Sequence, residues 1–401
     1  MKLSTRSKAY MIPEYSLTGD LLSFLTCNLQ YRYQNKGTLP PSMPVQLWFG
    51  EFIHGVMEEA YIKWDLEHKK FPWDWKKDIR PIENMIDLRL QVRGLYPPLD
   101  HFYSTNTPGN TLKIEDLTEE HKKLASARAE KAINTLGPDL FPLIDSAEVL
   151  IKGIRDIPNY DKNRSRSNYY GINGVIDVLS SLKINETFKN KAPALDNYKN
   201  RIIEYLKRDD TFQKTVQKLN EEEYEIIIDY KGMKRPSCDS PNWIHHAWQI
   251  LTYSWLRSKQ EESKPVVAGI VFYLNELVPS TEDLVAIQQD ISAKNTDVKI
   301  SSSDYNKLMN WDEDMDFPHL SEKFKKDRSI RIITIDQNNI DSALKEFDKV
   351  VNKIENSLIK EMDGCKIKDA WNADADERTC RACDFKTFCN KKNKIEEFKV
   401  P

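Results

Sequence analysis

The chain has 401 residues, of which 40% are hydrophobic and 10% aromatic, so it is long and apolar enough to bury a sizeable core in one elaborated domain or two. Its formal net charge of −3 results from 59 basic and 62 acidic residues, and this balance neither requires nor excludes a nucleic-acid partner. The N-terminus lacks the apolar region of a secretory signal, and no stretch approaches the roughly 18 apolar residues of a membrane-spanning helix. We therefore expect a cytoplasmic protein with no membrane partner.

The N-terminal part of the chain is expected to be helical. Residues 18–34 carry leucines at helical spacing, and residues 45–66 place a broad apolar face on a second helix, which also contains His54. The residues that follow are charged and interrupted by tryptophan and proline, until a helical pattern returns. We interpret 1–66 as an N-terminal helical part and 67–150 as a mostly helical insertion.

Two segments have the two-residue period of β-strands. Residues 170–179 alternate along the sequence YGINGVIDVL and contain Asp177, and residues 224–232 (YEIIIDYKG) place Asp229 and Lys231 on the same face. The acid and the lysine therefore project together from one strand. Beyond them we expect a helix, two strands and a closing helix, at residues 242–257, 266–274, 329–335 and 341–361.

Four of the six cysteines have the spacing of metal or cluster ligands. Cys380, Cys383 and Cys389 form a CxxCx5C motif near the C-terminus, and Cys27 lies on the first expected helix. Four thiolates are the usual ligands of an iron–sulfur cluster, but they also form closed tetrahedral zinc sites. A zinc ribbon more often has two CxxC pairs, so one distant cysteine with a CxxCx5C motif favours iron–sulfur. The remaining alternative is that Cys27 is a buried helix residue and only the three C-terminal cysteines are functional.

Asp177, Asp229 and Lys231 are the residue types that phosphodiester hydrolysis requires. Hard divalent cations bind carboxylate oxygens, and such an ion can polarise a phosphoryl oxygen and activate water. A nearby lysine can position that water and stabilise the developing charge. A single DxK match is common, because many strands end in a solvated acid and lysine. A second acid, an earlier helix with His54 and a later helix with a QxxxY motif make chance a poor explanation here.

The motifs occur in the order GxxxH (Gly50, His54), GVID (Asp177), DYK (Asp229, Lys231) and QxxxY (Gln249, Tyr253). Bracketed by the four cysteines, this order resembles the RecB-type PD-(D/E)XK nucleases. More narrowly, it is similar to their iron–sulfur branch, which contains the CRISPR-associated RecB-like exonucleases and the nuclease domain of AddB.

The resemblance implies an α/β fold with a mixed central β-sheet flanked by helices, that is, a restriction-endonuclease-like core with large, partly helical insertions. It implies hydrolysis of DNA, on single strands or ends, with Mg²⁺ or Mn²⁺ and a 4Fe–4S cluster, in repair, recombination, or CRISPR or anti-phage defence. The roles that it implies are metal binding for His54, Asp177 and Asp229, catalysis for Lys231, active-site or strand positioning for Gln249 and Tyr253, and cluster binding for Cys27, Cys380, Cys383 and Cys389.

With this resemblance, the part after 150 divides into three segments. These are a nuclease core at 151–280 with an insertion at 180–222, further strands and a closing helix at 281–361, and an Fe–S-bound, cysteine-rich segment at 362–401.

Two other functions remain open at this point. One is a catalytically silent nuclease-fold subunit that binds DNA or a partner protein, and the other is a zinc-stabilised structural module with an accidental DxK. The intact acids and lysine favour an active exonuclease or endonuclease. The sequence contains no Walker A motif, so any ATP-driven unwinding would come from a helicase or another protein subunit.

Overall fold

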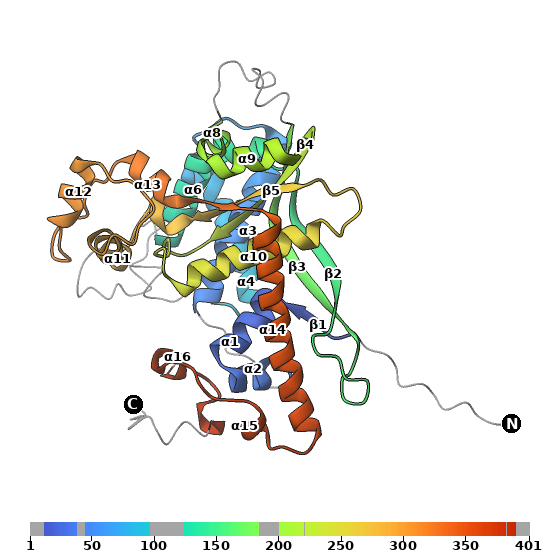
Figure 1. Ribbon diagram of the computed structural model, residues 1–401. Helices are drawn as coiled ribbons and strands as arrows, with labels where there is room; N and C mark the ends of the chain where they lie inside the picture. The colour runs from blue at the N-terminus through green and yellow to red at the C-terminus, as the bar shows by residue number, and fades with distance from the viewer. Residues whose placement is uncertain are drawn as a thin grey trace.

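The computed structural model describes residues 12–37, 45–96, 124–183, 200–219, 221–381 and 383–389. Its centre is a mixed six-stranded β-sheet with helices packed on both faces (Figure 1). The strands are β1 (Glu14–Ser16), β2 (Ser146–Asp156), β3 (Tyr169–Lys183), β4 (Glu223–Lys231), β5 (Val266–Tyr273) and β6 (Ile330–Thr334). The pairs β1/β3 and β4/β5 are parallel, and the pairs β2/β3, β3/β4 and β5/β6 are antiparallel. The predicted α/β fold with a mixed sheet, consistent with a restriction-endonuclease-like core, is therefore confirmed.

Each face of the sheet has its own apolar core. One core contains α3 (Val45–Glu67), α4 (Arg80–Val92) and α6 (Leu124–Leu140), and short α8 (Arg201–Arg208) and α9 (Asp210–Leu219) extend it. The opposite core contains α1 (Ser23–Thr26), α2 (Asn28–Asn35), α10 (Pro241–Arg257) and the long α14 (Gln337–Met362). The sheet is thus the middle of three layers, and its apolar strands β4 and β5 are buried almost throughout.

A third, smaller core holds a helical unit between β5 and β6. It consists of α11 (Thr281–Ser292), α12 (Ser302–Met309) and α13 (Glu322–Ser329), which lie to one side of the sheet (Figure 1). Each helix begins at a serine whose hydroxyl accepts a hydrogen bond from the first helical turn. The sequence analysis expected strands and a closing helix in this region, and it missed these three helices.

Charge pairs attach this helical unit to the sheet. Asp297 accepts hydrogen bonds from Arg235, at 2.9 and 2.6 Å, and from Arg331, at 3.0 Å through each oxygen. Arg328 of α13 forms a buried ion pair with Glu276 at 2.5 Å. Burial opposes ionisation of Asp297, but its arginine partners outweigh that effect and hold its pKa below the usual value. These contacts tie the helical unit to the turn after β5, through Glu276, and to β6, through Arg331.

Strand β3 changes partners along its length. Its edge opposite β2 pairs with β1 at residues 171–173 and with β4 at residues 178–183. Between these two pairings β3 and β4 separate, just beyond the pair Val178–Ile228. Asp177 and Asp229 would form the next pair, so they lie on the two arms of a fork in the sheet.

Helix α10 lies unusually close to the sheet. A Cβ atom at Gly174 would be 2.5 Å from Cε1 of Tyr253, and one at Gly269 would be 2.2 Å from Cγ2 of Ile250. Real Cβ atoms do not approach other atoms so closely, so these glycines permit the helix to rest on the strands. As a result the Gln249–Tyr253 face of α10 covers the fork.

The two ends of the described chain lie together. The amide of Leu29 donates to the carbonyl of Asn372 at 3.0 Å, and Arg32 binds Glu361 through two hydrogen bonds of 2.7 and 2.5 Å. Fully buried Trp371 donates from its indole to the same Glu361 at 2.9 Å. The segment that contains α15 (Ile367–Ala370) and α16 (Glu377–Arg381) therefore returns to α1 and α2, below the sheet in Figure 1.

Other elements differ from the sequence prediction in detail. The helix expected at 18–34 consists of a wide turn at Leu17–Leu22 followed by α1 and α2, which are separated at Cys27. Strand β2 begins at Ser146, inside the segment that was interpreted as a helical insertion. Parts of both predicted insertions, residues 97–123 and 184–199, lie outside the described residues, as do 390–401 of the C-terminal segment. Among the helices that are described, none is both long and apolar enough to cross a membrane.

Candidate active site

His54 and Asp177 meet at the fork. His54 projects from α3, and its Nδ1 lies 3.3 Å from Oδ2 of Asp177. Its Nε2 lies 2.8 Å from the carbonyl oxygen of Tyr230, which can only accept, so Nε2 carries the donated proton. The amide of Tyr230 in turn donates to Asp177 Oδ2 at 2.9 Å. The backbone of β4 therefore orients both side chains, as outer contacts do for metal ligands.

Asp229 and Lys231 form the second half of the site. The ammonium of Lys231 lies 3.0 and 2.8 Å from the two oxygens of Asp229. Gln249 of α10 joins both groups, because its Oε1 accepts from Lys231 at 2.9 Å and its Nε2 donates to Asp229 Oδ1 at 3.2 Å. The two residues of the DYK motif thus share a face, as the strand period predicts, and the helix holds them there.

Tyr253 lies one turn beyond Gln249 on α10. It is buried against Gly174, and its hydroxyl lies near Gln249 and the backbone of Val175. Burial, followed by the nearby charge of Asp229, raises the pKa of this hydroxyl. Tyr253 is therefore a neutral phenol that supports Gln249 from behind. Together these contacts place all six motif residues that the sequence nominated around the fork.

Glu148 is a site candidate that the sequence analysis missed. It lies on β2, and its carboxylate, His54 and Asp177 offer ligand atoms that are all within 4.8 Å of one another. Its backbone has a φ of +51°, a left-handed conformation that is uncommon for residues other than glycine. This conformation interrupts the β2–β3 ladder between Ala147 and Val149, and it directs the side chain to the fork. Strain of this kind is often found at functional sites.

The pKa values reflect a crowded set of charges. Burial would lower the pKa of His54, but the charge and hydrogen bond of Asp177 outweigh it and raise the pKa to about 9. Partial burial raises the pKa of Glu148 to about 7, and Asp177 adds to this rise. Burial also raises the pKa of Asp229, whereas His54 and Lys231 hold that of Asp177 below its usual value against its burial. Three acids therefore compete for two cationic side chains.

This donor set fits a hard divalent cation. Oδ2 of Asp229 is buried and makes no well-oriented hydrogen bond, although Lys231 Nζ is near it, so a lone pair remains available. Carboxylate oxygens with one imidazole nitrogen are suitable ligands for Mg²⁺ or Mn²⁺. The residues that could hold such an ion are His54, Glu148, Asp177 and Asp229. The three acids would lose their mutual repulsion when the ion binds.

The four motif cysteines come from the two ends of the chain and lie near one another. Cys27 is buried at the break between α1 and α2, where its extended backbone separates the helices. Burial raises the pKa of the Cys383 thiol, and the charges of Cys27, Cys389 and Cys380 raise it further. The packing of Tyr33 on Phe385, with ring centroids 5.7 Å apart, supports the same approach.

The comparison with known families adds independent support for the motifs. Residues 216–390 match the model of the PD-(D/E)XK nuclease superfamily. The match covers less than half of the chain, and it includes the DYK and QxxxY motifs and the C-terminal cysteines, whereas His54, Asp177 and Cys27 lie outside it. No curated protein matches the chain. The matched segment supports a nuclease, and a PD-(D/E)XK nuclease domain implies that DNA is bound.

Proposed function

We propose that this protein is a metal-dependent deoxyribonuclease that hydrolyses phosphodiester bonds in single strands or at DNA ends. The observation that carries the proposal is the fork, where Asp177 and Asp229 face each other across two strands and Lys231 contacts Asp229. His54 and Glu148 add ligand atoms at the same place. Metal ligands, a nearby lysine and an adjoining cavity for the substrate are the features that such a hydrolysis needs.

The reaction assigns a different task to each side chain. A bound divalent cation would supply Lewis-acid polarisation of a phosphoryl oxygen and promote formation of a nucleophile from water. Asp177, Asp229, His54 and Glu148 would hold it. Lys231 is held between Asp229 and Gln249, where it orients the attacking water. It also places a positive charge beside the pentacoordinate phosphorus as negative charge develops on its oxygens. His54 must lose the proton that it shares with Asp177 before Nδ1 can bind a metal.

We also propose that Cys27, Cys380, Cys383 and Cys389 bind a 4Fe–4S cluster with a structural role. The convergence of the four thiols from opposite ends of the chain supports this assignment. A cluster there would link α1 and α2 to the C-terminal segment, in addition to the contacts of Arg32 and Trp371. The RecB-like iron–sulfur branch, with work in DNA repair or in CRISPR or anti-phage defence, is the corresponding proposal for family and pathway.

The nuclease proposal is tested with purified protein and labelled single- and double-stranded oligonucleotides. Cleavage should require Mg²⁺ or Mn²⁺ and stop when a chelator is added. Asp177→Ala and Asp229→Ala should abolish it without changing the circular dichroism spectrum, because a ligand is lost and no core group. Lys231→Ala should lose cleavage but still bind Mn²⁺.

The matched control is Asp341→Ala, which removes an exposed acid from α14 and should cleave like the parent. Parental cleavage by the Asp177 and Asp229 variants would show that these residues are not the ligands. A well-folded parent that binds DNA but does not cleave it under any metal condition would instead favour the catalytically silent, DNA-binding subunit.

A further inference from the structure

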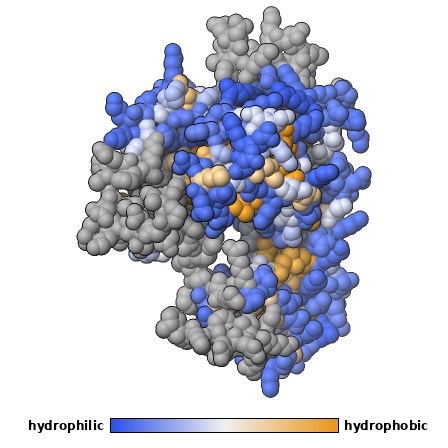
Figure 2. Space-filling model, turned by 90° about the vertical axis from the view of Figure 1, so that its left-hand side faces the viewer, coloured by the Kyte–Doolittle hydropathy of each residue, from blue (hydrophilic) through white to orange (hydrophobic). Residues whose placement is uncertain are grey.

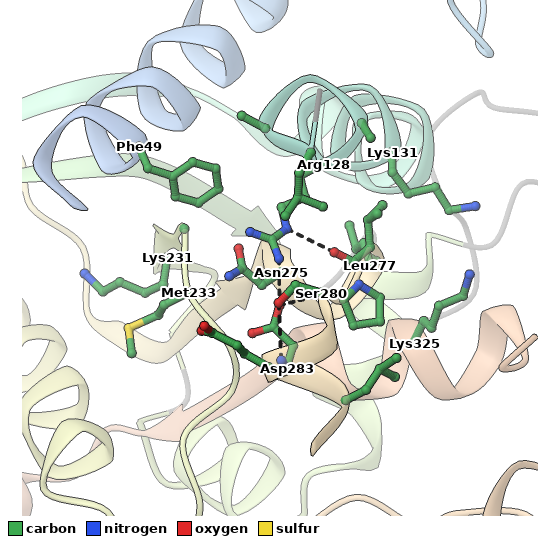
Figure 3. Close-up of a pocket in the computed structure, with 18 of the residues that line it drawn as sticks. Phe49, Arg128, Lys131, Lys231, Met233, Asn275, Leu277, Ser280, Asp283 and Lys325 are labelled. Carbon is green, nitrogen blue, oxygen red and sulfur yellow. Dashed lines mark hydrogen bonds and ion pairs between the residues drawn. The ribbon is translucent and has the colours of Figure 1, made fainter. Parts of the chain in front are cut away.

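A large cavity extends from the fork toward the helical unit. Its volume is about 1180 Å³, above the roughly 300–1,000 Å³ of most small-molecule pockets. His54 and Lys231 line one end, and Lys131 of α6 and Lys325 of α13 line the other. Figure 3 shows Lys231 on one side of the cavity and the other two lysines on the opposite side, with Arg128 between them. A ligand that fills this space would reach well beyond the reacting phosphate.

The cavity has two walls that come from different parts of the chain. One wall is α3 and α6, and the other is the helical unit of α11 and α13, which has its own apolar core and is tied to the turn after β5 by the Arg328–Glu276 ion pair. Seen from the side of the helical unit, the surface is mostly hydrophilic, and its hydrophobic residues gather mainly in the middle (Figure 2). The cavity lining itself combines lysines with apolar side chains such as Phe49, Leu277 and Phe317, and an anionic chain with apolar bases suits this combination.

The cationic side chains of the cavity differ in their freedom to bind a ligand. Arg128 is buried, and its guanidinium is already bound within the protein, because it donates to Asp283 at 2.6 Å and to the carbonyl of Val278 at 3.0 Å. Lys131 and Lys325, in contrast, share one carboxylate. Their ammonium groups lie 2.8 and 2.6 Å from the two oxygens of Glu322.

Glu322 resembles a bound anion in this arrangement. Each of its oxygens contacts one lysine, as two non-bridging oxygens of a phosphate could. Its side chain is 53% exposed, so it can turn into solvent without leaving a buried charge. Burial opposes its ionisation, but the two lysines hold its pKa below the usual value. Glu282 also lines the cavity, so the attraction for an anion would be local and not a long-range field.

We propose that Lys131 and Lys325 form a binding site for a backbone phosphate of single-stranded DNA, and that Glu322 occupies this site when DNA is absent. This inference rests on the proposed nuclease function, because it places the strand between the fork and the helical unit. The site would hold a phosphate remote from the one that is cut. Glu322 then acts as an internal competitor, which weakens binding of the strand.

The test is the affinity for a fluorescein-labelled oligothymidylate, measured by fluorescence anisotropy in metal-free buffer so that no cleavage occurs. Glu322→Gln should bind about threefold to tenfold more tightly, because the competing charge is gone while the side-chain shape is kept. Lys131→Ala and Lys325→Ala should weaken binding. Each should also reduce the slope of log K against log salt by about 0.7, the value for one phosphate contact on a single strand.

Helix α14 provides a closely matched control. Its Lys349–Glu346 pair has the same i,i+3 spacing as Lys325–Glu322, and Glu346 is also 53% exposed. Glu346→Gln and Lys349→Ala should bind the oligonucleotide like the parent. If Glu322→Gln behaves like Glu346→Gln, or the lysine variants keep the parental salt slope, the phosphate site is refuted.

Failure of the site and failure of the nuclease function give different results. If the parent cleaves DNA and Glu322→Gln binds the oligonucleotide as the parent does, the phosphate site is refuted and the nuclease function stands. If Glu322→Gln binds the oligonucleotide more tightly but the protein cleaves DNA under no condition, the nuclease function is refuted and the strand-binding site stands. Melting temperatures of the five variants, whose side chains are all at least partly exposed, show whether the fold is retained.

Discussion

Replacing Gln249 by alanine should separate the positioning of Lys231 from the binding of metal. Gln249 is buried, and its amide contacts the lysine at 2.9 Å and Asp229 at 3.2 Å. A hydrogen bond to a charged group contributes about 1.5–3 kcal/mol. Lys231 keeps its contact with Asp229 in the variant, so part of its orientation remains. We therefore expect kcat to fall about 10- to 100-fold, which corresponds to about 1.4–2.7 kcal/mol in the transition state.

The assay is steady-state cleavage of a labelled single-stranded oligonucleotide in excess over enzyme, at saturating Mn²⁺. The dissociation constant of the oligonucleotide should stay near the parental value, because Gln249 lies behind the charged groups and not on the cavity lining. Gln288→Ala is the control, since that glutamine likewise makes two hydrogen bonds through its side-chain amide, to the carbonyls of Leu308 and Trp311, but it lies in the helical unit. Equal losses of kcat in the two variants would mean a general effect on the fold. A parental rate in Gln249→Ala would refute the positioning role.

Three further changes test other parts of the structure. Glu148→Gln should raise the Mn²⁺ concentration needed for half-maximal cleavage about tenfold or more, and an unchanged metal titration would exclude it as a ligand. Anaerobically purified Cys27→Ala should lose its iron and melt at a lower temperature, whereas Cys238→Ala should keep the parental iron content and melting temperature. Iron retained in Cys27→Ala would show that the fourth ligand lies elsewhere. Stoichiometric zinc in the parent protein would show that the four cysteines bind zinc and not an iron–sulfur cluster. The pKa of Asp297 is lower in the folded state, so its ion pairs stabilise the protein above the unfolded-state pKa of about 4 and are lost in acid. Asp297→Asn should therefore lower the melting temperature most at pH 7 and by progressively less as the pH falls below about 4, and a loss that does not change with pH would contradict this linkage.

The sequence was informative where a side chain's neighbours are set by local geometry. The two-residue period of β4 correctly placed Asp229 and Lys231 on one face, and the helical period of α10 placed Gln249 and Tyr253 one turn apart. Which elements then meet is decided by register and packing over long distances. The fork of β3 and β4 could not be seen in the sequence, because it depends on where β1 takes over the edge of β3.

Glu148 shows the limit most clearly. Its neighbour Asp177 lies on the partner strand, and their approach requires the left-handed backbone at residue 148. A glutamate in the sequence does not predict such a backbone conformation. Exposed Leu150 and Ile154 on the same strand further obscure the alternation of β2, since apolar residues then occur on both faces. A period-two pattern with one irregular residue is thus easily taken for the end of a helical insertion.

The helical unit, in contrast, had readable signals that were overlooked. Ser280 with Asp283 forms a full capping box, and Ser301 is followed three residues later by Asp304 in the same pattern. The helices are only 12, 8 and 8 residues long, so their apolar faces are short and give little periodicity. Caps identify such helices better than hydrophobic patterns do.

The proposed metal site draws on more of the chain than the family match covers. Asp229 and Lys231 lie within residues 216–390, but His54 comes from α3, and Glu148 and Asp177 come from β2 and β3. The matched segment alone would therefore lack three of the four proposed ligands and the strand that forms the other arm of the fork. The backbone of Tyr230 joins the two parts, because it binds His54 through its carbonyl and Asp177 through its amide. The pairing of β3 with β4, which closes the loop of residues 184–222, is thus what brings Asp229 and Lys231 to the ligands from β2, β3 and α3.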